Sequence, residues 1–243
     1  MSQQATRLRK KKAEVMEVFD PITPQTKKKF TLKDLKRIQP LTESQKTVCY
    51  EWENGQNLFM DGFAGTGKTF LAMYLALSVL LDPDTPQDKI VIVRSIVPSK
   101  EIGFLPGTIE EKIAPYEAPY SQIFSELFTW KNTYENMKEI GLVRFDSTSF
   151  LRGNTFNNAI IIMDEIQNAT QVEAITALTR VGKNSRIIMC GDDLQTDERK
   201  SAWAEIVPIL RRMESVSFID FKLDDIVRSG FCKEFLMAYY SRK

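Results

Sequence analysis

The sequence predicts an α/β fold in which helices cover both faces of a central, mostly parallel sheet. Three unbroken runs rich in β-branched residues, 90–93, 159–163 and 186–190, have the pattern of strands that are buried on both faces. Helical patterns separate these runs, as parallel strands with helical connections require. A fourth short run, 58–60, leads directly into glycines and indicates another buried strand followed by a tight loop.

Helices are expected on either side of the strand at 58–60. Thr42 is placed to act as the N-cap of a helix that runs to about Asn54, and Gly55 is placed to end it. Residues 70–81 are apolar on nearly all faces, which is typical of a helix packed between a sheet and other helices. We expect this second helix to begin at the glycine-rich loop.

A third helical region, from about 108 to 140, follows a loop at 103–107. Pro115 and Pro119 lie inside this region. Proline removes a backbone donor and clashes with the preceding turn, so both residues are expected to break the helix.

Basic residues are concentrated at the N-terminus. Residues 1–37 contain 11 Lys/Arg and four Asp/Glu, a net charge of +7, whereas the other 206 residues have a net charge of −6. The 1–37 segment also has little apolar periodicity, so it is expected to form a flexible basic arm. Residues 38–243 are expected to form one domain with a single sizeable core.

The composition excludes several kinds of chemistry. The chain has no histidine, which rules out His-ligated zinc and Ser-His-Asp or Cys-His catalysis from this chain alone. Its three cysteines, Cys49, Cys190 and Cys232, are scattered and lack CxxC spacing, which favours free thiols in a reducing compartment. The longest apolar run has 12 residues, against about 20 needed to cross a bilayer. We therefore expect a cytoplasmic protein with no membrane partner.

Residues 62–69, Gly-Phe-Ala-Gly-Thr-Gly-Lys-Thr, match the pattern G-x-x-x-x-G-K-[ST] between a predicted strand and a predicted helix. Glycines allow backbone N–H groups to point at phosphate oxygens, and the helix N-terminus adds its positive dipole. Lys68 can reach the β- and γ-phosphates of ATP, and the Thr69 hydroxyl can bind Mg²⁺. The nucleotide-binding residues expected here are Gly62, Phe63, Ala64, Gly65, Thr66, Gly67, Lys68, Thr69 and Phe70.

Asp164 and Glu165 follow a predicted strand, so both carboxylates are expected at the carboxyl end of the sheet, where open parallel sheets bind ligands. Asp164 is the candidate second Mg²⁺ ligand beside Thr69, and Glu165 is the candidate group that orients or deprotonates the attacking water. An acidic pair at a strand end can also be a helix cap or a solvated loop. The nearby phosphate-binding loop favours the catalytic interpretation.

Two glutamines are candidates for contacts to the nucleotide. Gln195 follows the predicted strand 186–190 and can bond the γ-phosphate or the attacking water, although this segment could be only a turn. Gln45 lies on the helix that leads into the first strand, where its amide can face the adenine edge. An ordinary surface residue is the alternative for Gln45.

Arg228 is a candidate for neutralising charge near the γ-phosphate. A plain salt bridge with Asp224 or Asp225 is the alternative.

Taken together, these residues resemble the PhoH family of P-loop ATPases. The resemblance extends over about residues 40 to 240 and includes blocks outside the phosphate-binding loop and the acidic pair. In family order, these blocks are Leu41-Thr42-x-x-Gln45, Gly62 to Thr69, Arg94, Gly103 to Gly107 with Glu110-Glu111-Lys112 and Pro115-Tyr116, Arg152-Gly153-x-Thr155, Ile162 to Asn168, Gly191-Asp192-x-x-Gln195 and Asp225 to Arg228.

The resemblance implies a RecA-like core related to the first motor domain of superfamily 1 helicases, with ATP hydrolysis as the activity and RNA metabolism as the setting. Longer family members add a PIN nuclease or a KH-type RNA-binding domain, and residues 1–37 are too few for either. We expect a compact form that is similar to the phage-type members.

A superfamily 1 motor binds ATP between two RecA-like domains, and the second domain supplies an arginine that stabilises charge on the γ-phosphate. This chain is expected to contain one such domain. We therefore expect a neighbouring copy to complete the site with Arg152 or Arg228, in a closed homo-oligomeric ring whose expected size is a hexamer.

Three classes of function are compatible with these features. The favoured one is an ATPase that remodels RNA or single-stranded DNA, in which the basic arm and Phe104 contact the strand, unless the arm is only a solvated tail and Phe104 a core anchor. A small-molecule kinase also pairs a P-loop with a strand-end carboxylate, but Glu165 and Gln195 suit water activation better. A nucleotide-dependent assembly or regulatory protein with little turnover is the third.

Overall fold

A six-stranded sheet organises the chain, and every pair of neighbouring strands in it is parallel. The computed structural model describes residues 30–96, 109–148, 151, 155–192, 195 and 201–240. The strand order is β3-β2-β4-β5-β1-β6. The strands are β1 (Asn57–Gly62), β2 (Lys89–Arg94), β3 (Val143–Ser147), β4 (Ala159–Asp164), β5 (Arg186–Gly191) and β6 (Val216–Phe221). The predicted α/β fold with a parallel sheet is therefore confirmed.

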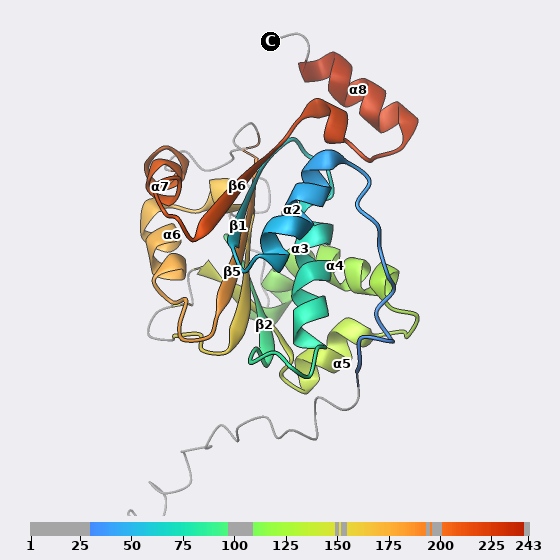
Figure 1. Cartoon of the computed structure of the whole chain (residues 1–243), viewed down its shortest axis with the longest axis vertical. Helices are drawn as coiled ribbons and strands as arrows, with labels where there is room; N and C mark the ends of the chain where they lie inside the picture. The colour runs from blue at the N-terminus through green and yellow to red at the C-terminus, as the bar shows by residue number, and fades with distance from the viewer. Residues whose placement is uncertain are drawn as a thin grey trace, which may run out of the picture.

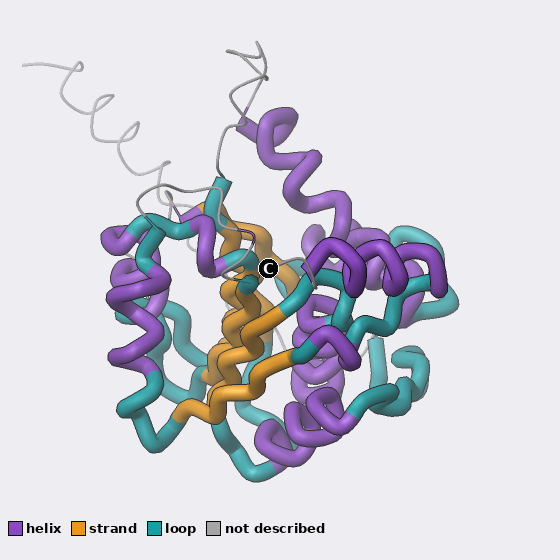
Figure 2. Tube along the Cα trace, turned by 90° about the horizontal axis from the view of Figure 1, so that it is seen from above, coloured by secondary structure: helices purple, strands orange, loops and turns teal. Residues whose placement is uncertain are grey.

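Helices form a layer on each face of the sheet, with one further helix set apart from both layers (Figure 1). One layer contains α2 (Glu43–Glu53), α3 (Lys68–Leu80), α4 (Ile109–Leu127) and α5 (Thr133–Glu139), and the other contains α6 (Gln171–Leu178) and α7 (Trp203–Leu210). Short 3₁₀ turns, η3 (Ile166–Asn168) and η5 (Leu223–Asp225), follow β4 and β6, and α8 (Gly230–Tyr240) ends the described chain. Figure 2, seen from above, shows the strands between the two layers.

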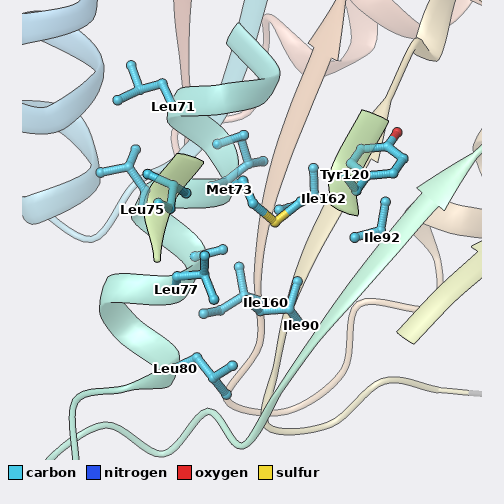
Figure 3. Close-up of a cluster of buried hydrophobic side chains, with 14 of the residues drawn as sticks. Leu71, Met73, Leu75, Leu77, Leu80, Ile90, Ile92, Tyr120, Ile160 and Ile162 are labelled. Carbon is cyan, nitrogen blue, oxygen red and sulfur yellow. The ribbon is translucent and has the colours of Figure 1, made fainter. Parts of the chain in front are cut away.

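The buried helix α3 anchors the larger layer. Met73, Leu77 and Leu80 face the isoleucines of β2 and β4, and Tyr120 of α4 closes one side of this cluster (Figure 3). All four isoleucines are fully buried, as the unbroken apolar runs predict. This packing holds the start of α3, and therefore the phosphate-binding loop, rigidly at the carboxyl end of the sheet. The labelled isoleucines are Ile90, Ile92, Ile160 and Ile162.

The helix α4 runs through Pro115 and Pro119 without a break, so the prediction that they interrupt it is wrong. Both prolines are exposed, on the opposite side of the helix from the buried residues Tyr120 and Phe124. Water can bond the carbonyls that lose their helical partners, while the buried side holds the helix against the core. Tertiary packing thus outweighs the local cost of proline.

The domain begins before residue 38. Phe30 and Leu35 are buried in the core cluster, and the Lys36 N–H donates to the Leu127 carbonyl at 2.8 Å. The part of the predicted arm from residue 30 onward is therefore packed on the domain, which corrects its expected boundary. Residues 1–29 of the arm, and the 103–107 loop with Phe104, lie outside the described residues.

None of the helices in the described ranges combines the length and hydropathy that a bilayer crossing requires.

Candidate nucleotide-binding and catalytic site

The loop formed by residues 62–69 connects β1 to α3, which is the context that its sequence predicts. Gly62, Gly65 and Gly67 all have positive φ, at 123°, 78° and 84°. A Cβ on Gly62 would lie 2.0 Å from the Phe221 carbonyl oxygen, so no side chain fits there. The loop therefore curls as a phosphate-binding loop must, and β6 closes against its start.

The Lys68 side chain is buried beneath this loop. Its Nζ donates to the carbonyl oxygens of Gly62 at 2.5 Å and Phe63 at 2.9 Å. Burial lowers the pKa of Lys68, and the nearby Cys190 and Asp192 act in the opposite direction. The ammonium group is therefore held at the loop, where its charge is only partly balanced.

The two predicted metal ligands lie in contact. The Thr69 hydroxyl donates to Oδ1 of Asp164 at 3.0 Å, at the point where the start of α3 meets the end of β4. Burial, together with the neighbouring Glu165, raises the pKa of Asp164, and hydrogen bonds from Tyr120 and Thr69 partly offset this effect. A hydroxyl beside a carboxylate is a donor set that suits Mg²⁺.

The described residues contain no group of three His, Cys, Asp or Glu that could hold a metal by themselves. Thr69 and Asp164 are the residues that would hold Mg²⁺, an ion usually bound by one or two carboxylates together with substrate phosphates and water.

Glu165 adopts a left-handed backbone conformation, with φ 53° and ψ 43°. Its Oε2 accepts a hydrogen bond of 2.5 Å from Gln167 Nε2, and Gln167 Oε1 accepts from the Asp192 N–H at 3.1 Å. Gln167 is fully buried and so joins the ends of β4 and β5 while it holds the Glu165 carboxylate. We did not predict a role for Gln167 from sequence. Its spacing of two residues after Glu165, inside a block that resembles the family, was the available signal.

Gln195 lies in the turn after β5, where its N–H donates to the Asp192 carbonyl at 3.0 Å. Its side chain is exposed. Because β5 lies between β1 and β4 in the sheet, this turn leaves the sheet between the phosphate-binding loop and Asp164. The contact of Gln195 with phosphate or water stays a prediction.

Gln45 is buried and bonds the phosphate-binding loop itself. Its Nε2 donates to the Thr66 carbonyl at 3.0 Å, and its Oε1 accepts from the Leu41 N–H at 2.8 Å. The alternative of an ordinary surface residue is wrong, since 7% of Gln45 is exposed. The structure gives Gln45 a positioning role at the loop, and its contact with adenine stays a prediction.

Arg228 lies against the phosphate-binding loop of its own chain. The preceding N–H, of Val227, donates to the Gly65 carbonyl at 3.0 Å, and a Cβ on Gly65 would lie 2.7 Å from Arg228 Cγ. Arg228 forms no ion pair with any described residue, so the predicted alternative of a salt bridge with Asp224 or Asp225 is not formed. The action of Arg228 on a neighbouring copy stays a prediction. Arg152 lies outside the described residues.

The family model described as "PhoH-like protein" matches residues 37–240. The chain belongs to the PhoH family. It is 35% identical over 212 residues to Protein PhoH of Escherichia coli (strain K12), covering 85% of this chain and 59% of that protein. It is also 32% identical over 208 residues to a PhoH-like protein of Bacillus subtilis (strain 168), covering 84% and 64%. The chain thus spans about three fifths of the PhoH relatives that it matches.

Solved structures share the fold of this PhoH-family chain at low sequence identity. The large terminase of a thermophilic bacteriophage, in complex with ADP, has a TM-score of 0.53 and is 12% identical, covering 82% of this chain and 50% of the terminase. A second crystal form of that terminase has a TM-score of 0.52 and 14% identity, with the same coverage of 82% and 50%. The expected α/β fold is confirmed: the chain has a parallel sheet with a P-loop between β1 and α3, and the terminase shares this fold.

Proposed function

We propose that the protein hydrolyses ATP with the help of Mg²⁺ at the carboxyl end of the sheet. The single observation that carries this proposal is the 3.0 Å contact between the Thr69 hydroxyl and Oδ1 of Asp164, at the mouth of a phosphate-binding loop. These are the two protein groups that a Mg²⁺–nucleotide site needs, and they come from elements that are far apart in sequence.

Each part of the site has a defined task in this proposal. The loop N–H groups and the start of α3 bind the phosphates, and Lys68 exchanges its two carbonyl partners for phosphate oxygens. Bound Mg²⁺ would neutralise charge on the β- and γ-phosphates. Glu165 orients and deprotonates the attacking water, with Gln167 fixing its Oε2, and Arg228 stabilises phosphate charge.

Lys68→Ala tests this proposal. We expect the variant to lose roughly 100-fold or more in nucleotide affinity and to release no phosphate, because a charge-assisted contact to phosphate disappears. Lys46→Ala is the matched control, since Lys46 is a lysine on α2 that pairs only with the exposed Glu43. A Lys68→Ala protein that binds and hydrolyses ATP like the wild type would defeat the proposal.

Two alternatives make different predictions in the same assay. A small-molecule kinase would protect the γ-phosphate from water, so it would release little free phosphate and would transfer the phosphoryl group to an acceptor, leaving ADP. A nucleotide-dependent assembly protein would bind ATP with negligible turnover, and Glu165→Gln would alter its association state without changing its rate. Phosphate release without any acceptor favours hydrolysis over both.

We infer that the protein couples ATP hydrolysis to the remodelling of RNA or single-stranded DNA. The net charge of +7 on residues 1–37 supports this inference, because clustered Lys and Arg bind phosphate backbones without sequence preference. The ATPase rate should rise when single-stranded RNA or DNA is added, and the stimulation should fall as salt rises. A rate that neither nucleic acid changes at low salt would contradict the inference.

We also infer that copies of the chain associate next to the nucleotide site. The helix α8 has no buried residue, and Phe231, Phe235 and Tyr239 are 81%, 59% and 55% exposed. The helix stands beside the phosphate-binding loop, because the Phe63 and Tyr240 rings lie 4.7 Å apart. Exposed apolar surface of this kind marks an interaction site.

A second group of exposed apolar residues belongs to α6 and α7, which cover the face of the sheet opposite to α3 (Figure 1). It includes exposed Val172, Ile175 and Ile209. Two different apolar surfaces on one chain are what a head-to-tail ring requires, and a hexamer is the size that we propose. Sedimentation of the wild type should reveal oligomers that Phe235→Ser weakens, whereas wild-type monomers with the full ATPase rate would defeat this inference.

A further inference from the structure

The two oxygens of the Asp164 carboxylate are held by donors from different helices. Thr69 of α3 donates to Oδ1 at 3.0 Å, and the Tyr120 hydroxyl of α4 donates to Oδ2 at 2.8 Å. Asp164 is 4% exposed and Tyr120 is fully buried. Because each oxygen has its own partner, the carboxylate cannot turn about its Cβ–Cγ bond without breaking a buried hydrogen bond.

The Tyr120 hydroxyl is the donor in its bond to this carboxylate. A neutral phenol can donate to Asp164 without adding a charge that would compete with a cation at Oδ1.

Arg94 is a further neighbour of Tyr120. It lies directly opposite Asp164 in the β2–β4 register, where Tyr120 and Asp164 are among its close electrostatic neighbours. Its guanidinium lies 5.8 Å from the centre of the Tyr116 ring, one turn earlier on α4. Residues of β2, β4 and α4 thus come together around a single hydroxyl group.

We propose that Tyr120 is a positioning residue that presents Oδ1 of Asp164 to Mg²⁺. This inference rests on the proposed Mg²⁺–ATP site and adds a residue to it. Partners of a ligating carboxylate typically change metal affinity by about 10- to 100-fold when removed. A purely structural Tyr120 would affect folding stability and leave the metal requirement of the site unchanged.

Tyr120→Phe tests the proposal, because it keeps the buried ring and removes only the hydroxyl. We expect the free Mg²⁺ concentration for half-maximal binding of a fluorescent ATP analogue to rise about 10-fold or more. Binding of the same analogue in the presence of a chelator should stay as in the wild type. The Mg²⁺ dependence of phosphate release should shift in the same direction.

Tyr134→Phe is the matched control. Tyr134 is also a buried tyrosine, and its hydroxyl donates at 2.6 Å to a carboxylate of α4, that of Glu117, which is remote from Asp164. Its loss should lower the urea midpoint about as much as the loss of the Tyr120 hydroxyl does, with no change in the Mg²⁺ midpoint. This comparison separates an effect on the site from an effect on α4.

Each outcome decides the proposal. A raised Mg²⁺ midpoint in Tyr120→Phe alone supports it, whereas an unchanged midpoint, or an equal rise in both variants, overturns it. These two negative results leave the proposed ATPase standing, because the wild type still shows Mg²⁺-dependent binding. A wild type that binds the analogue equally well with and without Mg²⁺ overturns the proposed function, and this inference with it.

Discussion

Polar side chains have different roles at the two ends of the parallel sheet. At the amino end, Arg186 opens β5, and its Nη2 donates to the carbonyls of Trp52 and Gln56, at 2.7 Å each. Its guanidinium also lies 3.3 Å from the centre of the Trp52 ring. Asn57, at the start of β1, accepts from the Ile187 N–H at 2.9 Å. These contacts join α2 and β1 to β5, so their effect is on stability.

At the carboxyl end, charged groups are held close together at a cost. Asp164 is buried beside a second carboxylate, and Glu165 has a left-handed backbone. A non-glycine residue with such a backbone costs about 1–3 kcal/mol. Contacts at the amino end of the sheet therefore stabilise the fold. The carboxyl end instead keeps an energetically unfavourable arrangement of charged groups that is suited to binding a ligand.

The largest expected effect comes from a pair of glycines at the two ends of β1. Gly62→Ala should destabilise the fold by about 3–5 kcal/mol, because strain at positive φ adds to a clash with the Phe221 carbonyl. Gly55→Ala should cost only about 1–2 kcal/mol, since Gly55 has φ +87° but no atom within 4 Å of its added Cβ. Urea unfolding measures both, and equal losses would contradict the clash.

Glu165→Gln should separate activity from stability. We expect kcat to fall roughly 10²- to 10⁴-fold, because an amide cannot accept the proton of the attacking water. Nucleotide affinity and the urea midpoint should change little, since the side chain keeps its shape and its contact with Gln167. Glu43→Gln, at an exposed carboxylate of α2, serves as the control. A matching loss of stability and rate would place Glu165 among the structural residues instead.

Arg186→Lys should show the reverse pattern. A lysine cannot bond two carbonyls from one planar group and stack on Trp52 at the same time. We expect a loss of about 1–3 kcal/mol in the free energy of unfolding, with kcat and the Mg²⁺ midpoint unchanged. Unfolding and steady-state assays on one preparation test this. A large fall in kcat without a change in unfolding would remove the contrast between the two ends.

The smallest effect is expected at Asp225, a structural carboxylate at the carboxyl end. Burial alone would raise its pKa, but hydrogen bonds from the Lys222 N–H, Thr42 and Ser44 outweigh it, and the pKa is lowered. Asp225 therefore stabilises the fold above its unfolded pKa of about 3.9, and this contribution is lost as the pH falls through the folded value. Asp225→Asn should cost about 1 kcal/mol near neutral pH.

The pH dependence checks that assignment. The difference in unfolding free energy between the wild type and Asp225→Asn should stay constant at neutral pH and shrink below about pH 4. Urea midpoints of both proteins over this range supply the measurement. A difference that grows towards acid pH would have the opposite sign to the one expected from a lowered pKa.

Much of the fold could be predicted because its central strands are buried on both faces. Runs such as 159–163 are short, continuously apolar and rich in β-branched residues, which is typical of a covered parallel strand. The edge strands β3 and β6 could not be predicted in this way. Each lies at an edge of the sheet and mixes buried residues with partly or fully exposed ones. The order of the strands likewise depends on how the layers pack, which no local pattern encodes.

The candidate site likewise contains residues that could be predicted from the sequence and others that could not. Gly62 to Thr69 and the pair Asp164–Glu165 are short motifs whose chemistry is local, and the structure brings them together as expected. Tyr120 could not be found in this way, because its partner is 44 residues away and its own helix contains two prolines. Its importance arises from tertiary packing alone.

Gly191, the last residue of β5, is closely packed between α7 and the turn that follows the pair Asp164–Glu165. A Cβ there would lie 2.5 Å from Trp203 of α7 and 2.8 Å from Ile166 of η3, the turn that follows Glu165. Close-packed interiors have low compressibility, so an inward push on Trp203 must displace either β5 or η3. Pressure from a binding partner on α7 would thus shift either the end of β5 or the turn that follows Glu165.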